Sequence, residues 1–168
     1  MITLGIDPGL ATVGFGVVES VLGNDFHALE YGAILTKPDL SIEDRLCEIY
    51  DNVDELCKTF CPDAVSVEKL YFNTNTTTAI AVAEARGVIQ LALTKNNIPY
   101  GEYTPLQVKQ SVTGYGRAEK NQVMSMVKML LNLQKIPRPD DAADGLALAI
   151  CHAHCMGSFA MKGLNLKG

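Results

Sequence analysis

Ile2-Thr-Leu-Gly-Ile-Asp7 is an apolar run that ends in a carboxylate, and the turn residues Pro8-Gly9 follow it directly. A second run of the same kind, Ala64-Val-Ser-Val-Glu68, also ends in an acid. Short apolar runs bounded by turn residues are typical of buried strands. A carboxylate at the margin of a core is costly unless it is paired or binds a cation. The two runs therefore predict core strands whose terminal acids need a partner of opposite charge.

Two further acids, Asp141 and Asp144, stand at the start of an apolar stretch that reaches residue 150. Residues three apart lie on one face of a helix. Four carboxylates that converge would repel one another, so they would need metal ions to ionise together, and such oxygen ligands suit Mg²⁺ or Mn²⁺. A divalent-metal site is the first hypothesis. Alternatives stay open: Asp7 could cap a turn, Asp141 and Asp144 could favour a helix N-terminus, and Asp140 could compete with Asp141.

The rest of the chain alternates between strand and helix patterns. The expected strands are residues 1–7, 14–19, 26–35, 64–68 and 98–103. The expected helices are residues 42–60, 77–95 and 119–131, a helix that begins at Pro105, and a helix that begins at Asp140 or Asp141. Ser41 and Thr104 are the expected caps of the helices that begin at residues 42 and 105. The first three strands are joined by short turns, one of them at residues 23–25, and predict an antiparallel meander. The strand–helix–strand order that follows predicts a parallel pairing of the fourth strand. Gly87 lies in a helix rich in small residues, so we expect its backbone to pack closely against another backbone.

The composition narrows the class of protein. A length of 168 residues argues for one domain. No apolar run approaches about 20 residues and no export signal is visible, so we expect a cytoplasmic protein without a membrane span. Five cysteines, an odd number, suggest reduced thiols. Cys151-His-Ala-His-Cys155 looks like a zinc cluster, but the spacing is unlike that of zinc modules, and an ordinary helix end is the favoured interpretation.

The charge is unevenly distributed, although the net charge is only -5. Residues 39–63 carry eight acids and two bases, a net of -6, whereas residues 105–138 carry six bases and one acid, a net of +5. A basic segment can bind phosphates even on an acidic protein. The alternative is a solvated helix surface.

Several motifs in this order resemble the RuvC-type Holliday-junction resolvases of the ribonuclease H-like superfamily over nearly the whole chain. The matching segments are Gly5-Ile-Asp7-Pro-Gly9, Val67-Glu68-Lys-Leu-Tyr71-Phe72, Glu84-Ala-Arg86-Gly87, Val108-Lys109-Gln110, Gly114-Tyr-Gly116-Arg-Ala-Glu-Lys120, and Asp141-Ala-Ala-Asp144-Gly. The resemblance implies an α/β fold with a mixed five-stranded sheet, of order 3-2-1-4-5 with strand 2 antiparallel, flanked by helices. The first and fourth strands would then bring Asp7 and Glu68 to the same end of the sheet. Because the resemblance weakens after residue 155, we expect a domain at 1–155 and a poorly ordered tail at 156–168.

The resemblance also implies roles for individual residues. Asp7, Glu68, Asp141 and Asp144 correspond to the catalytic acids that bind two Mg²⁺ ions, for which Mn²⁺ can substitute. Lys109 and Lys120 correspond to the lysines that contact DNA, and we expect Arg117 to assist them. Tyr71 occupies the position of an aromatic residue, more usually phenylalanine, that stacks on a base at the junction, and Phe72 follows it. The alternative for both aromatic residues is packing in the core.

The activity that these features imply is that of a structure-selective endonuclease. It would resolve four-way DNA junctions by paired, metal-dependent hydrolytic nicks in recombination and repair, as a homodimer acting with the RuvA–RuvB branch-migration complex. The alternatives are a ribonuclease H-like nuclease on another substrate, such as an RNA–DNA hybrid, and a non-catalytic module that binds junctions. An actin-like ATPase or sugar kinase also has an acid-x-Gly turn on its first strand. That architecture needs two related domains, whereas 168 residues supply only one, so this class of protein is disfavoured.

Overall fold

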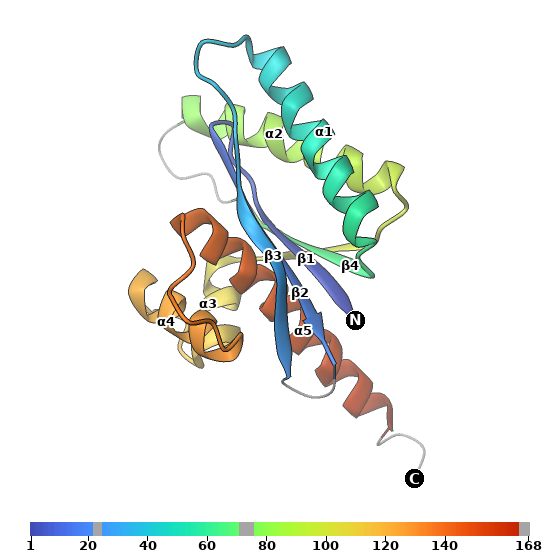
Figure 1. Cartoon of the computed structure of the whole chain (residues 1–168), viewed down its shortest axis with the longest axis vertical. Coiled ribbons are helices and arrows are strands. Elements are labelled where there is room, and N and C mark those ends of the chain that lie inside the picture. Colours follow the sequence, from blue (N-terminus) through green and yellow to red (C-terminus); the bar gives the residue numbers. More distant parts are fainter. Residues whose placement is uncertain (22–24, 71–75, 165–168) are drawn as a thin grey trace.

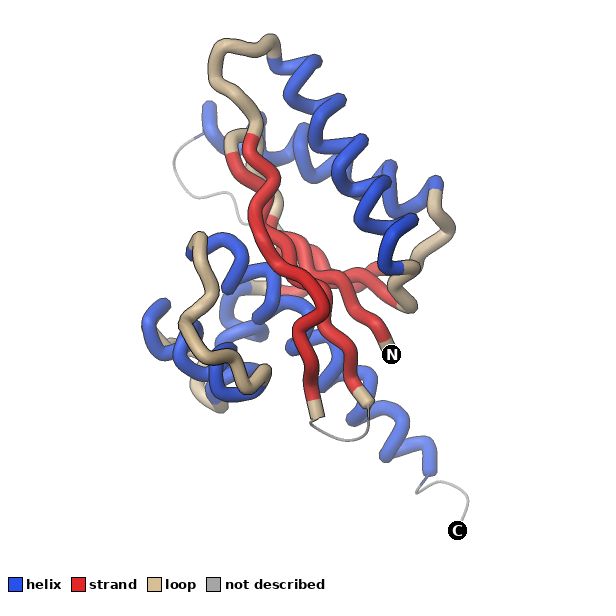
Figure 2. Tube along the Cα trace, in the orientation of Figure 1, coloured by secondary structure: helices blue, strands red, loops and turns tan. Residues whose placement is uncertain are grey.

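A five-stranded mixed sheet forms the centre of the molecule (Figures 1 and 2). The structure, a computed structural model, describes residues 1–21, 25–70 and 76–164. The strands are β1 (Ile2–Asp7), β2 (Thr12–Ser20), β3 (Phe26–Leu35), β4 (Ala64–Glu68) and β5 (Tyr100–Tyr103). The helices are α1 (Ile42–Phe60), α2 (Thr76–Lys95), α3 (Pro105–Thr113), α4 (Lys120–Leu130) and α5 (Asp140–Leu164).

The strand order is β3-β2-β1-β4-β5, which confirms the predicted topology. The first three strands pair antiparallel, and β1 and β4 pair parallel, as do β4 and β5. The apolar runs that end in Asp7 and Glu68 are therefore neighbours at the centre of the sheet. Because they run in the same direction, both terminal acids reach the same edge.

Helices cover both faces of the sheet and close two separate cores. Helices α1 and α2 lie on one face, and α5, with α3 and α4 outside it, covers the other face (Figure 1). Leu4, Ile6, Val65 and Val67 are fully buried, as expected for central strands that are covered on both sides. The helix 42–60 follows its predicted bounds, with Ser41 as the cap that accepts from the backbone N–H of Asp44 at 3.1 Å.

The segment after β5 is held by predicted capping residues. The Thr104 hydroxyl accepts from the Gln107 backbone N–H at 3.1 Å, and the Gln107 side chain accepts from the Thr104 backbone N–H at 2.9 Å. Helix α3 ends at Gly114, whose φ of 77° lies in the left-handed region that favours glycine. These local signals set the direction of α3 as it leaves the acidic edge of the sheet.

Some expectations differ from the structure. Strand β5 begins at Tyr100 rather than residue 98. Among the described residues, a Cβ added at Gly87 would meet nothing within 4 Å, so the expected close packing against another backbone is wrong within one chain, and packing against a partner subunit stays a prediction. Helix α5 continues beyond residue 155 to Leu164. Residues 22–24 of the predicted turn and 165–168 of the predicted tail lie outside the described residues, and the division at residue 155 stays a prediction.

The Cys151–Cys155 segment lies inside α5, as an ordinary helix would place it. The Nδ1 atom of His152 lies 2.9 Å from the Tyr103 hydroxyl, and Nδ1 of His154 lies 3.1 Å from the Ser111 hydroxyl. These histidines therefore join α5 to β5 and α3. Within residues 1–21, 25–70 and 76–164, no helix combines the length and hydropathy that a membrane crossing requires.

Candidate metal centre

Asp7 and Glu68 are the last residues of two paired parallel strands. Ile6 of β1 is in register with Val67 of β4, so the acids that follow them lie side by side. The two carboxyl groups are close enough to share a hydrogen bond. The folding of two apolar strands thus places two acidic side chains in contact at the edge of the core.

The other two acids reach this edge because α5 lies unusually close to the sheet. A Cβ added at Gly14, the partner of Asp7 on β2, would lie 2.1 Å from the backbone oxygen of Asp141. A Cβ added at Gly145 would lie 2.4 Å from the Phe15 carbonyl carbon. Only glycine permits this contact between a helix backbone and a sheet. The first turn of α5, with Asp141 and Asp144, is therefore held beside Asp7.

The electrostatics of the cluster show the cost of bringing these acids together. Burial, followed by the charges of Glu68 and Asp144, raises the pKa of Asp7 to about 8. Burial also raises the pKa of Glu68 and of Asp144 above their ordinary values. The charge of Asp141 contributes to the raised pKa of both Asp7 and Asp144. A group of acids that resists ionisation in this way is suited to divalent cations, which would favour the ionised form.

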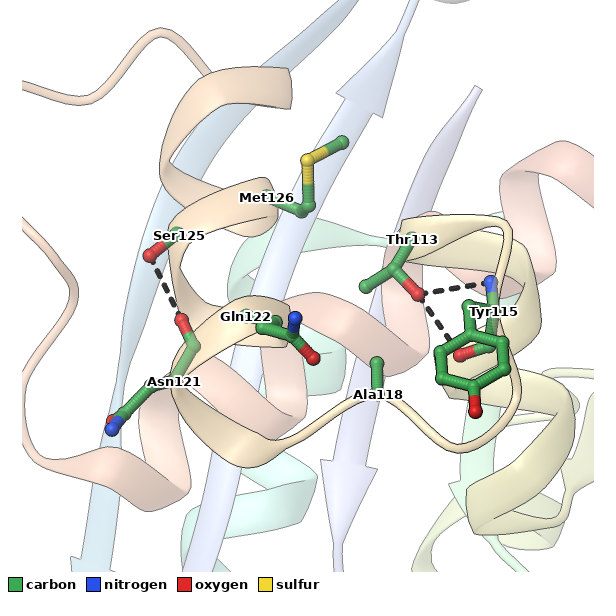
Figure 3. A pocket seen from close by; sticks show the side chains of 7 residues that line it. All are labelled: Thr113, Tyr115, Ala118, Asn121, Gln122, Ser125 and Met126. Carbon is green, nitrogen blue, oxygen red and sulfur yellow. Dashed lines mark hydrogen bonds between the residues drawn. The ribbon is translucent and has the colours of Figure 1, made fainter.

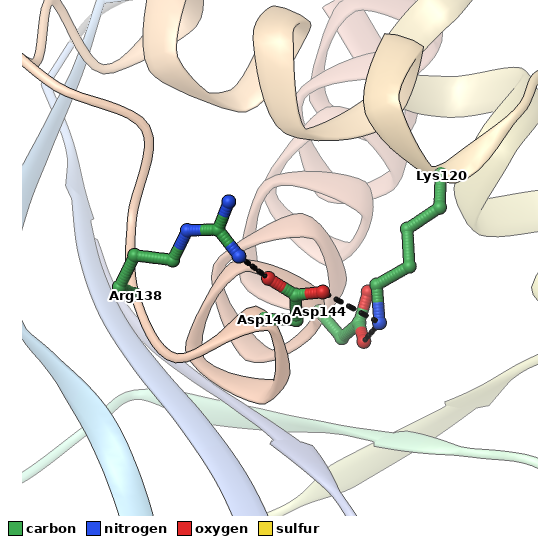
Figure 4. A network of polar contacts seen from close by, with 4 residues as sticks. All are labelled: Lys120, Arg138, Asp140 and Asp144. Carbon is green, nitrogen blue, oxygen red and sulfur yellow. Dashed lines mark hydrogen bonds and ion pairs between the residues drawn. The ribbon is translucent and has the colours of Figure 1, made fainter.

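Lys120 supplies a positive charge to this cluster (Figure 4). Its ammonium donates to Asp144 Oδ2 at 3.0 Å and lies 3.9 Å from Asp140 Oδ2. Asp140 in turn contacts the guanidinium of Arg138. Burial lowers the pKa of Lys120, but the hydrogen bond and charge of Asp144 outweigh it, so the net change is upward. Asp140 thus pairs with Arg138 and Lys120, and its charge also acts on Asp144, so the choice of Asp141 over Asp140 stays a prediction.

A cavity of about 230 Å³ connects the acids to the basic helices. Its lining includes three of the four acids and both predicted lysines, and it consists of Asp7, Glu68, Pro105, Val108, Lys109, Lys120, Val123, Asp144, Ala147 and Leu148. Carboxylates at the base and ammonium groups at the wall suit a ligand that combines a divalent cation with a phosphate. Among the described side chains, no three His, Cys, Asp or Glu residues are spaced closely enough to hold a metal ion together in this structure. The donor set nevertheless fits hard cations, because every candidate ligand is a carboxylate oxygen.

The remaining predicted site residues are less closely tied to the cavity. Arg117 is exposed on the loop between α3 and α4 and does not line it. Tyr71 and Phe72 lie outside the described residues. Sequence reasoning gave no site role to Arg138, which reaches the cluster through Asp140. The only signal for it was its basic charge two residues before Asp140.

The raised pKa of Asp7 predicts how the stability of the metal-free protein depends on pH. The folded protein retains a proton that the unfolded chain releases near pH 3.8. The stability due to this proton is complete below that value and is lost as the pH rises through about 8. In EDTA, Asp7→Asn should therefore raise the melting temperature at pH 8.5, by at least about 2–4 °C. At pH 4 the difference from the unsubstituted protein should largely disappear.

Thermal denaturation across this pH range tests the expectation. Asp51→Asn is the matched control, because Asp51 is an exposed acid on α1, away from the cluster. Its melting curve should follow that of the unsubstituted protein. A constant temperature difference between Asp7→Asn and the unsubstituted protein at every pH would contradict a buried, protonated Asp7.

The sequence of this chain is similar to those of known nucleases. The family profile described as "Crossover junction endodeoxyribonuclease RuvC" matches residues 3–152. A protein of that name from Alkaliphilus metalliredigens is 56% identical over 154 residues, which cover 92% of this chain and 93% of the relative. A second, from Desulforamulus reducens, is 52% identical and covers 95% of this chain and 97% of the relative.

Solved structures agree with the sequence comparison. The structure described as "T. thermophilus RuvC in complex with Holliday junction substrate" superposes with a TM-score of 0.90 at 36% identity, covering 95% of this chain and 96% of that one. The yeast mitochondrial Holliday junction resolvase Ydc2 superposes with a TM-score of 0.61 at 11% identity, covering 94% of this chain and 85% of that one. At that identity the yeast protein supports the fold alone.

Proposed function

The chain belongs to the family of RuvC crossover junction endodeoxyribonucleases, and we propose that it resolves four-way DNA junctions by hydrolytic nicks made at the carboxylate cluster. The observation that carries this proposal is the cavity in which Asp7, Glu68 and Asp144 face Lys109 and Lys120. It combines ligands for divalent cations with groups that bind phosphate. The cavity lies at the edge of the sheet where the resemblance to the RuvC family places the catalytic acids.

The acids and the lysines have different tasks in this proposal. Asp7, Glu68, Asp141 and Asp144 hold two Mg²⁺ ions, with Mn²⁺ as a substitute. When bound, such a metal pair activates the attacking water and stabilises the leaving 3′ oxygen. Lys109 and Lys120 hold phosphates of the strand to be cut, and Arg117 binds the strand further out. Lys120, which pairs with Asp144 and lines the same cavity, would be available to bind a phosphate if Asp144 held a metal ion.

We further propose a homodimer that acts in the cytoplasm with the RuvA–RuvB complex. A four-way junction has two equivalent strands to cut, and a two-fold dimer presents two equivalent sites. Ile80 and Leu91 on α2 are 62% and 50% exposed, and with Gly87 they share one helix face. An apolar face of this kind supports contact with a second copy.

The activity is tested by offering three substrates to the same preparation. A synthetic four-way junction, a linear duplex and an RNA–DNA hybrid are each incubated with and without Mg²⁺. We expect paired nicks in the junction alone, and only with the metal. Preferential cleavage of the hybrid would support the alternative ribonuclease H-like activity, and junction binding without any cleavage would support a non-catalytic module.

Lys109→Ala should weaken junction binding and reduce its dependence on salt. One phosphate contact contributes about 0.9 to the slope of log K against log salt concentration on duplex DNA. The variant should lose approximately that amount, because Lys109 lines the cavity beside the acids. The slope is measured from binding titrations at several salt concentrations in EDTA.

The control for Lys109 is a lysine far from the cluster. Lys95→Ala removes the same charge from the exposed end of α2. We expect its salt slope to match that of the unsubstituted protein. An equal loss of slope in both variants would mean that the total charge matters, and that Lys109 makes no specific phosphate contact.

A further inference from the structure

A second cavity, of about 480 Å³, lies outside the carboxylate cluster, between the end of α3 and the start of α4. Figure 3 shows Thr113 and Tyr115 on one side and the first turns of α4 on the other. The lining combines an aromatic ring, two amides and a thioether with small side chains, and consists of Thr113, Tyr115, Ala118, Asn121, Gln122, Ser125 and Met126. It contains no ionisable acid or base apart from the phenol. The cavity is therefore suited to a neutral group with both flat and polar surfaces.

The same two helices line both cavities. Lys109 faces the carboxylates, and Thr113, one turn later on α3, faces the second cavity. Four residues of helix span about 6 Å, and one nucleotide of a duplex strand spans about 3.4 Å along the axis. On α4, Lys120 faces the carboxylates while the next residue, Asn121, faces the second cavity. A strand whose phosphate lies against the two lysines therefore has its neighbouring nucleotides beside the second cavity.

The backbone around Tyr115 is fixed in place before any ligand binds. The Thr113 hydroxyl accepts from the Tyr115 backbone N–H at 3.1 Å and lies 2.8 Å from the Lys109 carbonyl, to which it donates. The Gly116 backbone N–H donates to the Gln110 side chain at 3.0 Å. The turn that carries Tyr115 is thus tied back to α3. A ring presented from a fixed turn loses little conformational entropy on binding.

The exposed groups of the cavity are available to a ligand. The Tyr115 side chain is 59% exposed. The Asn121 side chain is also exposed, and within the described residues its amide has no hydrogen-bond partner. The Gln122 side-chain oxygen accepts from the Glu119 backbone N–H at 2.8 Å, which leaves its NH₂ group for other acceptors. Together these residues offer one stacking surface and amide groups of both hydrogen-bonding kinds.

We propose that this cavity receives a base of the junction DNA next to the scissile phosphate, with Tyr115 stacked on the base and Asn121 contacting its edge. The proposal rests on the proposed function and adds a substrate subsite to it. A volume of this size lies within the range of ligand sites, and tyrosine stacks on any base. Asparagine amides pair with base edges, adenine above all. A phosphate is disfavoured inside the cavity because the lining offers no cation, whereas Arg117 and Lys120, which precede the lining residues Ala118 and Asn121 in the sequence, supply positive charge for the flanking phosphates.

Photocrosslinking tests whether a base reaches Tyr115. Four-way junctions that carry 5-iododeoxyuridine at single positions on either side of the cleavage site are bound in EDTA, irradiated, and digested for peptide mapping. We expect an adduct on Tyr115 from one or two adjacent positions. Tyr100 is the internal control, since it is 40% exposed but lies away from the acids. It is the first residue of β5, whereas Glu68 of β4 pairs with Tyr103, the last residue of β5.

Substitutions provide an independent measurement. Tyr115→Ala should weaken junction binding roughly 5- to 160-fold, the range for loss of one stacked base, whereas Tyr115→Phe, which keeps the ring, and Tyr100→Ala should bind as the unsubstituted protein does. Asn121→Ala should reduce the differences in cleavage rate among junctions that vary only in the flanking base. Adducts only at other residues, together with normal binding by Tyr115→Ala, would overturn the subsite while junction cleavage itself remained intact. If the unsubstituted protein neither bound nor cut junctions, the proposed function would fail as well.

Discussion

Replacing Asp7 with asparagine is expected to abolish junction cleavage while junction binding persists. Asp7 is half-buried, and the charges of all three other acids raise its pKa. An amide supplies no negative charge to hold two divalent cations. Since metal assistance contributes several kcal/mol to such reactions, we expect the rate to fall roughly 1,000-fold or more. Binding in EDTA should be unchanged near neutral pH, because an Asp7 whose pKa is raised to about 8 carries little charge there. It should become tighter above about pH 8, where the substitution removes a negative charge from a surface that faces phosphates.

The two effects are measured on one set of junctions. Cleavage is followed by single-turnover kinetics in Mg²⁺, and binding by titration in EDTA. The stability measurement described above supplies the folding control, because Asp7→Asn should melt at a higher temperature than the unsubstituted protein at pH 8.5. A variant that loses cleavage, binding and stability together would indicate misfolding. A variant that still cleaves at a near-normal rate would remove Asp7 from the catalytic site.

The central sheet could be predicted from sequence because its signals are local. The apolar runs that end in Asp7 and Glu68 are short and bounded by turn residues, and Ser41 and Thr104 are caps that act within three residues. Local patterns of this kind depend little on the rest of the fold. The strand order required the resemblance to a family, since no local signal states which strands pair.

Contacts between distant segments were harder to predict. The lysine at position 120 was expected to contact DNA, but its ion pair with Asp144 depends on how α4 packs against α5. The interaction of Arg138 with Asp140 depends on the direction in which the chain enters α5. The second cavity requires the relative positions of α3 and α4. Each of these features arises from tertiary packing, for which the sequence carries no short pattern.

Gly87 and Gly14 show why one residue type can mislead. Both are glycines within regular elements, where glycine is normally unfavourable and close packing is the usual explanation. At Gly14 a Cβ would lie 2.1 Å from the Asp141 oxygen, whereas at Gly87 it would meet nothing within 4 Å. Sequence alone cannot distinguish a glycine that faces a backbone from one that faces open space. This difference provides a matched pair of substitutions.

Gly14→Ala is expected to damage both the fold and the metal centre. The added methyl group would overlap the backbone oxygen and carbonyl carbon of Asp141, at 2.1 and 2.6 Å, so α5 must move away from the sheet. Overpacking of this kind costs about 1–3 kcal/mol, which corresponds to a fall in melting temperature of roughly 2–12 °C. Since Gly14 pairs with Asp7, the movement also separates Asp141 from its neighbour. A displacement of about 1 Å at a catalytic group can reduce the rate roughly 100-fold.

The measurements are melting temperature, Mg²⁺ affinity by calorimetry, and cleavage well below the melting transition. Gly87→Ala is the control at protein concentrations at which the chain is monomeric, and there it should melt at an equal or higher temperature because alanine favours a helix by about 1 kcal/mol over glycine. A fall in its melting temperature only at concentrations at which the chain dimerises would support contact between Gly87 and a second copy. If Gly14→Ala bound Mg²⁺ and cleaved junctions normally, the close approach of α5 to β2 could not be what positions Asp141. The cluster would then have to depend on the side chains of α5 alone.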